Sequence, residues 1–278
     1  MSALDSQVIR FIKAHAYGND FLYIRADAVD GVRLDALARE LCDRHTGIGA
    51  DGLIIYEPVP DGASMRLFNA DGGRAEVSGN GVRALGAILL NGIEPNAPVS
   101  REIIIHTEAG PKMLTLVGLD GARQMFRADM GIPRDLRQTS VSVDGEVLSP
   151  IVMDMGNPQA ILLGSLPDVG RFHRIGAALQ QHPAFPAGTN LEFAEVEALD
   201  RVRILIWERG VGPTTSSGTG SCAALVAAAA FGGASRIADV VAPGGAQRVE
   251  WQDDSVYLTG WAEVLCSGEW HRQVPRTS

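Results

Sequence analysis

The stretch Ser78–Ala87, SGNGVRALGA, recurs as Ser217–Val226, SGTGSCAALV, and the copies stand half of the 278-residue chain apart. Each copy follows a β-rich stretch after a short loop, and each opens a segment that is apolar on almost every side of a helix. A helix of that composition has to be buried. Repetition at half length indicates a duplication, so the sequence predicts two pseudo-symmetric lobes, each a curled sheet around a central helix.

The repeated turn has a clear physical use. Its two glycines let the backbone approach a ligand closely. The amides at a helix start, together with the positive end of the helix dipole, attract a carboxylate or phosphate. Serine is also a good N-cap residue, a purely structural role for Ser78 and Ser217 that does not exclude the first. Because the turn occurs twice, we predict that the copies face each other across one anion-binding site.

The rest of the chain indicates an α+β fold with curled mixed or antiparallel sheets. Gly, Pro, Asn or Asp residues bound the short β-rich runs, and helical patterns are few. Predicted strands are Val8–His15, Phe21–Arg25, Leu53–Glu57, Met65–Asn69, Ile103–Thr107, Met113–Leu119, Gln124–Asp129, Ile151–Met155, Asn190–Ala194, Arg201–Trp207, Val240–Ala242, Gln247–Trp251 and Ser255–Thr259. Predicted helices are Asp35–Asp43, Asn80–Leu90, Arg171–Gln181 and Gly220–Phe231. We expect an N-terminal lobe of residues 1–130, completed by 268–278, and a C-terminal lobe of 131–267.

Composition excludes several classes of function. With 46% hydrophobic and 21% charged residues the chain has the profile of a globular protein with a core. A net charge of −9 argues against a general binder of nucleic acid or anionic membranes. No apolar run is long enough to span a bilayer, and the first residues lack the pattern of a secretory signal. These features favour a cytoplasmic protein that acts on a small molecule, and a homodimer is compatible with them.

Metal and cofactor chemistry find little support. The cysteines Cys42, Cys222 and Cys266 lie far apart, and the histidines show no metal-ligand spacing. The only lysines are Lys13 and Lys112, and neither lies in the glycine- or serine-rich neighbourhood expected of a pyridoxal-phosphate lysine. We therefore expect no cofactor and no metal.

Other polar turns lie between the predicted strands or at their ends. His15–Phe21 has the form of a hairpin turn, and Phe68–Gly73 and Met155–Gln159 are strand ends with turn chemistry. Glu208 and Arg209 close the strand that leads to the second repeat, where an arginine could clamp a carboxylate with two hydrogen bonds.

Taken together, these motifs resemble the diaminopimelate epimerase family. The matches are collinear and span nearly the whole chain: His15–Phe21, Gly49–Leu53, Phe68–Gly72, Ser78–Arg83, Met155–Pro158, Thr189–Asn190, Glu208–Gly212 and Gly218–Gly220. The resemblance implies two pseudo-symmetric lobes, a cofactor-independent site in the cleft between them, and an amino-acid substrate. It also implies inversion of an α-carbon by two facing cysteines, one removing the proton as thiolate and the other returning one as thiol.

Carried over by position, the resemblance assigns roles to particular residues. The two cysteines correspond to Ser78 and Ser217, and Glu208 would support the acid–base chemistry. Binding of the distal end of the substrate would fall to Asn19, Asn69, Asn157, Asn190 and Arg209. Binding of the proximal carboxylate would fall to the turn residues Gly79, Asn80, Gly218 and Thr219.

This sequence departs from the family pattern at the positions that would move the proton. Both cysteines are serine, and Gln159 stands where the family pattern leads us to expect histidine. A thiol has a pKa near 8.5, whereas a hydroxyl is several units more basic and needs a strong activator. Cys222 does not supply the missing thiol, because we expect it on the buried helix.

Three interpretations remain open at this level. In the first, the two serines are engineered replacements of cysteine in an otherwise ordinary epimerase, which then traps its substrate, and Gln159 needs a separate reason. In the second, the chain is a paralogue that acts on another small amino or carboxylic acid, with a carboxylate such as Glu76 or Glu208 as base. In the third, it is a catalytically silent amino-acid-binding protein.

Overall fold

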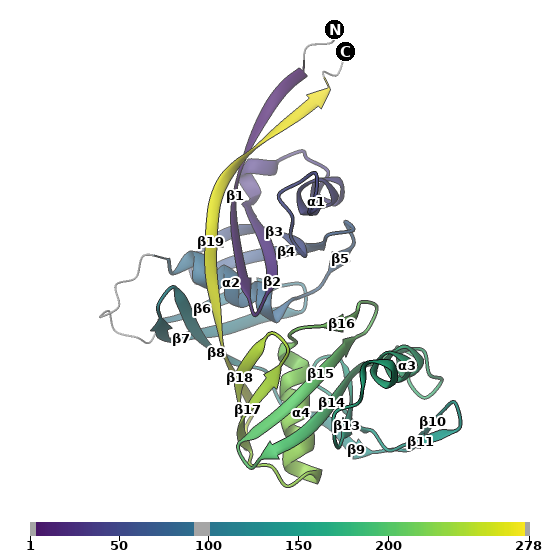
Figure 1. Ribbon diagram of the computed structural model, residues 1–278. Helices are drawn as coiled ribbons and strands as arrows, with labels where there is room; N and C mark the ends of the chain where they lie inside the picture. The colour runs from purple at the N-terminus through teal and green to yellow at the C-terminus, as the bar shows by residue number, and fades with distance from the viewer. Residues whose placement is uncertain (1–3, 92–100, 276–278) are drawn as a thin grey trace. The chain divides into compact units, whose positions relative to one another are not determined.

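Strands outnumber helices in the computed structural model, which describes residues 4–91 and 101–275 (Figure 1). The predicted α+β class is confirmed. The chain forms two compact units, one of Met1–Phe126 with Trp261–Ser278 and the other of Arg127–Gly260. No helix among the described residues is long and apolar enough to cross a membrane.

The first unit is built around two α-helices. Its elements are β1 (Leu4–Ala16), β2 (Asn19–Arg25), the 3-10 helix η1 (Ala26–Val29), α1 (Leu34–Cys42), β3 (Gly52–Val59), β4 (Gly62–Asn69), β5 (Arg74–Ala75), α2 (Gly79–Leu89), β6 (Arg101–Thr107), β7 (Gly110–Asp120) and β8 (Arg123–Asp129), which runs into the second unit. Helix α1 covers one face of the sheet through Leu37, Ala38 and Leu41. Helix α2 packs against β1, β2 and β6.

The second unit repeats this plan. Its elements are β9 (Arg134–Gln138), β10 (Val141–Val143), β11 (Glu146–Leu148), β12 (Ile151–Asp154), β13 (Pro158–Leu163), α3 (Val169–Gln180), β14 (Asn190–Ala198), β15 (Arg201–Glu208), β16 (Gly212–Thr214), α4 (Gly218–Phe231), β17 (Ile237–Ala242), β18 (Gly245–Trp251) and β19 (Val256–Pro275), which continues into the first unit. Helix α3 covers one face of the sheet, and the other face packs on α4, whose side chains are buried from Ser221 to Ala228.

The order of pairing shows the duplication. In the first unit β2 is parallel to β3, β3 is antiparallel to β4, and β4 is parallel to β6. In the second unit β13 is parallel to β14, β14 is antiparallel to β15, and β15 is parallel to β17. Helices α2 and α4 follow the short strands β5 and β16 at equivalent points. The duplication predicted from the repeated turn is therefore present in the topology.

The predicted helices and strands are present, but the prediction missed or shortened several strands. Strand β13 begins at a proline and has a continuous apolar run without alternation. The short strands β5, β9, β10, β11 and β16 have too few residues to show an alternation of apolar and polar side chains. Strand β19 continues far beyond the predicted Thr259, because β1 pairs with it from Leu4 to His15. Strand β12 ends at Asp154, one residue earlier than predicted, where Gly156 turns the chain with a φ of 89°.

Candidate active site

Both repeated turns start a helix by the same contact. Ser78 has an extended backbone, and its hydroxyl oxygen accepts a hydrogen bond from the Gly81 amide at 3.1 Å. Ser217 accepts one from the Gly220 amide at 3.1 Å in the same way. Each serine is thus the N-cap of its helix, and its oxygen lies beside the first amides, which have no partner within the helix. A carboxylate at either turn would meet amides and the positive end of the helix dipole.

In the first unit an asparagine lies beside the turn. Asn19, at the start of β2, accepts a hydrogen bond from the Asn80 amide of α2 at 3.3 Å. Its own amide nitrogen donates to Asp51 at 2.8 Å. Asn69 lies at the end of β4, and the amide of the next residue donates to the Asp51 carbonyl at 3.1 Å. The structure therefore brings Asn19, Asn69 and Asn80 to one edge of this unit.

A group of charges holds that edge. Asp20 pairs with Lys13 at 2.9 Å and with Arg44 at 2.7 Å, and Arg44 also pairs with Asp51 at 2.8 Å. Burial by itself would raise the pKa of Asp20, but the hydrogen bonds from Arg44 and Lys13 outweigh it and the pKa is lowered. Asp20 is therefore ionised at neutral pH and anchors the strand end that carries Asn19.

Helix α2 also buries a cation. The side chain of Arg83 is 1% exposed and lies over the Tyr17 ring at 5.7 Å, and its guanidinium donates to the Asn80 side chain. A buried charge has to be paired or hydrogen-bonded, so this contact fixes Asn80 at the turn. Arg83 has no role among the sequence predictions, although a basic residue in an otherwise apolar helix is a visible signal.

In the second unit Asn157 occupies the place of Asn19. Its amide donates to the Thr219 hydroxyl at 3.4 Å, as Asn80 contacts Asn19 in the first unit. Gln159, 1% exposed, contacts Asn157 at 2.8 Å and Thr219 at 3.1 Å. An asparagine at the edge of the sheet thus meets the second residue of the helix in both units.

Two carboxyl groups lie on the α4 side of this unit. Glu208 ends β15, and its pKa is raised by burial although the hydrogen bond from Thr214 at 3.1 Å opposes the shift. Glu192 on β14 is fully buried, and burial together with the charge of Glu208 holds its pKa well above the ordinary value. Glu208 is among the residues predicted from the sequence, and Glu192 is not. The signal for Glu192 was its place in the strand between Asn190 and Ala194, which alternation puts on the same face.

Hydrogen bonds of the Asn190 side chain connect neighbouring strands and include the backbone amide of Arg209. The Asn190 amide donates to the Pro158 carbonyl at 3.0 Å, and its oxygen accepts from the Arg209 backbone amide at 2.9 Å. The Arg209 side chain is exposed and donates to the Ala187 carbonyl at 2.8 Å. Asn190 therefore positions Arg209. Glu76, the alternative base considered from the sequence, is exposed ahead of α2.

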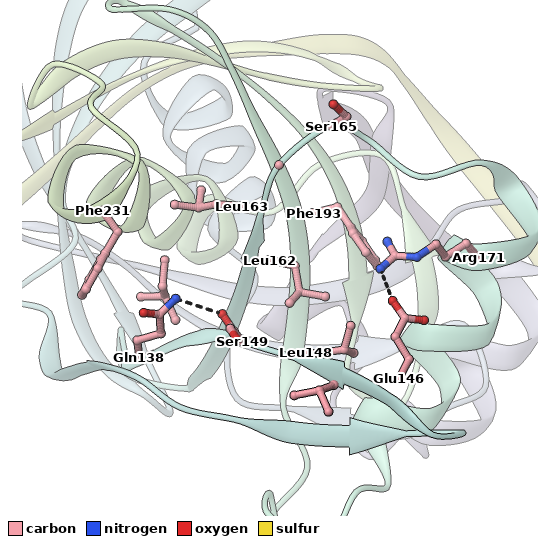
Figure 2. Close-up of a pocket in the computed structure, with 13 residues that line it drawn as sticks. Gln138, Glu146, Leu148, Ser149, Leu162, Leu163, Ser165, Arg171, Phe193 and Phe231 are labelled. Carbon is pink, nitrogen blue, oxygen red and sulfur yellow. Dashed lines mark hydrogen bonds and ion pairs between the residues drawn. The ribbon is translucent and has the colours of Figure 1, made fainter.

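A separate hollow of about 330 Å³ lies in the second unit, away from the predicted site residues (Figure 2). Leu148, Leu162 and Phe193 give it an apolar lining. Figure 2 shows Arg171 paired with Glu146 at one side of the hollow. No predicted site residue lines it, and its charges satisfy each other.

Comparisons with known proteins agree with the resemblance seen in the sequence. A sequence model described as diaminopimelate epimerase matches residues 11–134 and 151–265. A diaminopimelate epimerase of Desulforudis audaxviator is 38% identical, over 95% of this chain and 100% of the relative. Diaminopimelate epimerase 1 of Nostoc is 39% identical, over 94% and 99%.

The chain belongs to the diaminopimelate epimerase family. Its relatives are isomerases, and the family predicted from the motifs is confirmed. Cys222 is fully buried in α4, as expected. No group of acidic, histidine or cysteine side chains suited to a metal ion is found among the described residues.

Solved structures of low sequence identity share the fold. A predicted epimerase from Pseudomonas aeruginosa has a TM-score of 0.71 at 16% identity and covers 94% of this chain and 99% of its own. A probable proline racemase from Agrobacterium radiobacter has a TM-score of 0.70 at 16% identity, with coverages of 94% and 92%. A methylitaconate isomerase has a TM-score of 0.64 at 14% identity and covers 96% of both chains. This fold thus carries proteins named for several substrates.

Proposed function

We propose that this chain is a cofactor-independent epimerase of diaminopimelate that moves the α-proton by a two-base mechanism. The observation that carries the proposal is the pair of serine-capped helix starts, each with an asparagine beside its second residue. In a two-base mechanism one group removes the α-proton and a second group returns a proton to the opposite face. A duplicated fold supplies one such group per unit.

The roles are those that the family resemblance implies. The amides of the two turns, at Gly79, Asn80, Gly218 and Thr219, bind the α-carboxylate of the substrate. The distal end of the substrate is bound by Asn19, Asn69, Asn157, Asn190 and Arg209. Ser78 and Ser217 lie at the positions of the proton-moving groups, and Glu208 is the titratable group of the second unit that supports them.

Glu208 is the better base of the second unit. Its raised pKa brings proton exchange closer to neutral pH. The Ser217 hydroxyl is several units more basic than a thiol, and its oxygen already accepts the Gly220 amide. We therefore expect slower proton transfer than a cysteine at position 217 would give.

Two other functions have a specific observation in their favour. A racemase or isomerase of another small amino or carboxylic acid fits the replacement of both cysteines and the glutamine at 159, because a more acidic C–H needs a weaker base. A silent amino-acid-binding protein fits the use of both serine hydroxyls as helix caps.

Deuterium wash-in at the α-carbon of meso-diaminopimelate in D₂O tests the proposal. We expect measurable exchange with the native chain and faster exchange with Ser78→Cys/Ser217→Cys, because a thiolate forms near neutral pH. Ser78→Ala/Ser217→Ala is the matched control. Proline and 2-methylitaconate are run in parallel as the other candidate substrates.

The possible outcomes separate the three functions. Exchange only in the cysteine variant, with binding in both, would identify a silent binding protein with an intact pocket. Exchange of proline or 2-methylitaconate in preference to diaminopimelate would favour the second function. No exchange of diaminopimelate in either protein would contradict the assignment of the substrate.

A further inference from the structure

Glu192 lies directly beneath the start of α4. Its Oε1 contacts the position that a Cβ on Gly220 would occupy, so a side chain at 220 would displace it. Ser217 Oγ borders the same position at 3.0 Å. A carboxyl group with no exposed surface therefore lies against the first turn of the helix whose N-cap is Ser217.

No cation neutralises Glu192 among the described residues. The elements packed around it, with β14 itself, contribute few titratable side chains: none on β13, Cys222 on α4, Arg201, Arg203 and Glu208 on β15, and Glu195 and Glu197 on β14. Both arginines of β15 pair with the exposed Glu197. Helix α3 packs on the opposite face, where its two arginines pair with Glu146. Glu208 is thus the charge that acts on Glu192, and it is of the same sign.

The Gln159 side chain connects Glu192 to the turn. One end of its amide group lies 2.8 Å from Asn157 and 3.1 Å from Thr219, and the other end lies 3.2 and 3.3 Å from the two carboxyl oxygens of Glu192. A protonated Glu192 donates to the amide oxygen of Gln159, so that the amide nitrogen faces Asn157 and Thr219. An ionised Glu192 accepts hydrogen bonds from the amide nitrogen, and the amide oxygen then faces Asn157 and Thr219.

The duplicated fold provides an internal comparison. In the first unit the side chain beneath the equivalent glycine, Gly81, is Ile54, whose Cδ1 lies 2.8 Å from the corresponding Cβ position. The strand register likewise puts Phe21, opposite Gly52, where the second unit has Gln159, opposite Asn190. The same architecture is thus built with an apolar pair, so packing does not require the buried polar pair, which is costly to bury.

We infer that Glu192 is a positioning residue whose proton fixes the direction of the hydrogen-bond chain through Gln159 to Asn157 and Thr219. With the proton present, Gln159 presents N–H groups to both residues, and Asn157 keeps its own amide nitrogen as a donor. Loss of the proton reverses Gln159 and with it the donor and acceptor pattern at this edge. Glu192 thereby determines whether the edge recognises a carboxylate, a role that extends the proposed binding of an amino acid.

The proton itself is tested without any ligand. Infrared difference spectra of native protein against Glu192→Gln are expected to show a carboxylic acid C=O band at neutral pH that disappears in the variant. Glu197→Gln, on the same strand but exposed, is the matched control and should keep the band. Absence of the band in the native protein, or its loss in Glu208→Gln instead, would overturn the inference whatever the substrate proves to be.

The effect on recognition is tested by calorimetric titration with meso-diaminopimelate between pH 6 and 10. Above the pKa of Glu192 we expect affinity to fall about tenfold per pH unit in the native protein. Glu192→Gln, whose amide donates to Gln159 at every pH, should bind as the native protein does at pH 6 and keep that affinity at high pH. Glu192→Leu should bind weakly throughout while remaining folded.

Equal losses in Glu192→Gln and Glu192→Leu at pH 6 would contradict the directional role and leave only a general need for the glutamate. Absence of binding by the native protein at every pH would instead refute the proposed substrate, and the infrared result would still decide where the proton resides.

Discussion

The hydroxyl oxygens of Ser78 and Ser217 cap their helices in the same geometry, each accepting an amide three residues on. In the proposed mechanism a helix cap and a proton-moving group thus coincide in one side chain. The neighbours of the two serines differ, because Ile54 lies beneath the first turn and Glu192 beneath the second. The second turn thus has a carboxyl group beneath it at the place where the first has an apolar side chain.

The buried carboxyl of Glu192 predicts a pH-dependent stability. Unfolded chains ionise glutamate near its ordinary pKa of 4.5, whereas the folded protein holds the pKa of Glu192 well above that value. The stability contributed by this group is therefore full below pH 4.5 and is lost as pH rises through the folded pKa. Between these limits the free energy of unfolding should fall by about 1.4 kcal/mol per pH unit more steeply in the native protein than in Glu192→Gln.

Urea denaturation at a series of pH values measures this difference. Glu197→Gln is the control, because the pKa of exposed Glu197 is lowered by Arg203 and Arg201, and its contribution is lost only as pH falls. Parallel curves for native protein and Glu192→Gln from pH 5 to 8 would show that Glu192 is not buried as an acid.

Among the single elements, α2 and α4 begin where the local sequence predicts. Serine, then glycine, then an apolar run is a local signal for a capped and buried helix, and both helices begin within one residue of Ser78 and Ser217. Strand β13 gave no such signal, because its apolar run is covered on one face by α3 and on the other by α4. A strand buried on both faces loses its alternation.

The caps predict a modest and specific loss of stability. Ser78→Ala and Ser217→Ala should each lower the free energy of unfolding by about 1 kcal/mol, since an amide at the helix start loses its partner. Asp168 caps α3 by the same kind of contact, at 2.8 Å to the Arg171 amide, and Asp168→Ala should cost a similar amount.

Chemical denaturation of these variants provides the measurement. Ser78→Asp and Ser217→Asp retain an acceptor at the cap and should recover most of the lost stability. If the aspartate variants are as unstable as the alanine variants, the hydroxyl has another structural role than capping.

At the scale of the whole molecule, the first unit is completed by residues from the far end of the chain. Strand β19 pairs through Glu263–Pro275 with Leu4–His15 of β1. Trp270 Nε1 and Arg272 Nε each donate to Glu40 of α1 at 3.0 Å. Closing so long a stretch of chain costs conformational entropy, so these contacts depend on the rest of the unit.

Glu40→Ala should therefore loosen the end of β19 without disturbing the second unit. We expect faster amide hydrogen exchange in β1 and in residues 266–272 and unchanged exchange in β14 and β15. Glu269→Ala is the matched control: it removes the exposed pair with Arg10, and surface pairs of this kind contribute little. Uniform acceleration through both units would show that they unfold together.

The family, the duplication, the four helices and the two serine-capped turns were all predictable from the sequence, because each follows from spacing, capping chemistry or an apolar run. Three features became visible only in the folded chain: the burial of Glu192 beneath α4, its connection to Asn157 through Gln159, and the pairing of β19 with β1. These three features share one cause. Burial, pKa and hydrogen-bond direction depend on which residues distant along the chain come together, and a linear pattern does not contain that information.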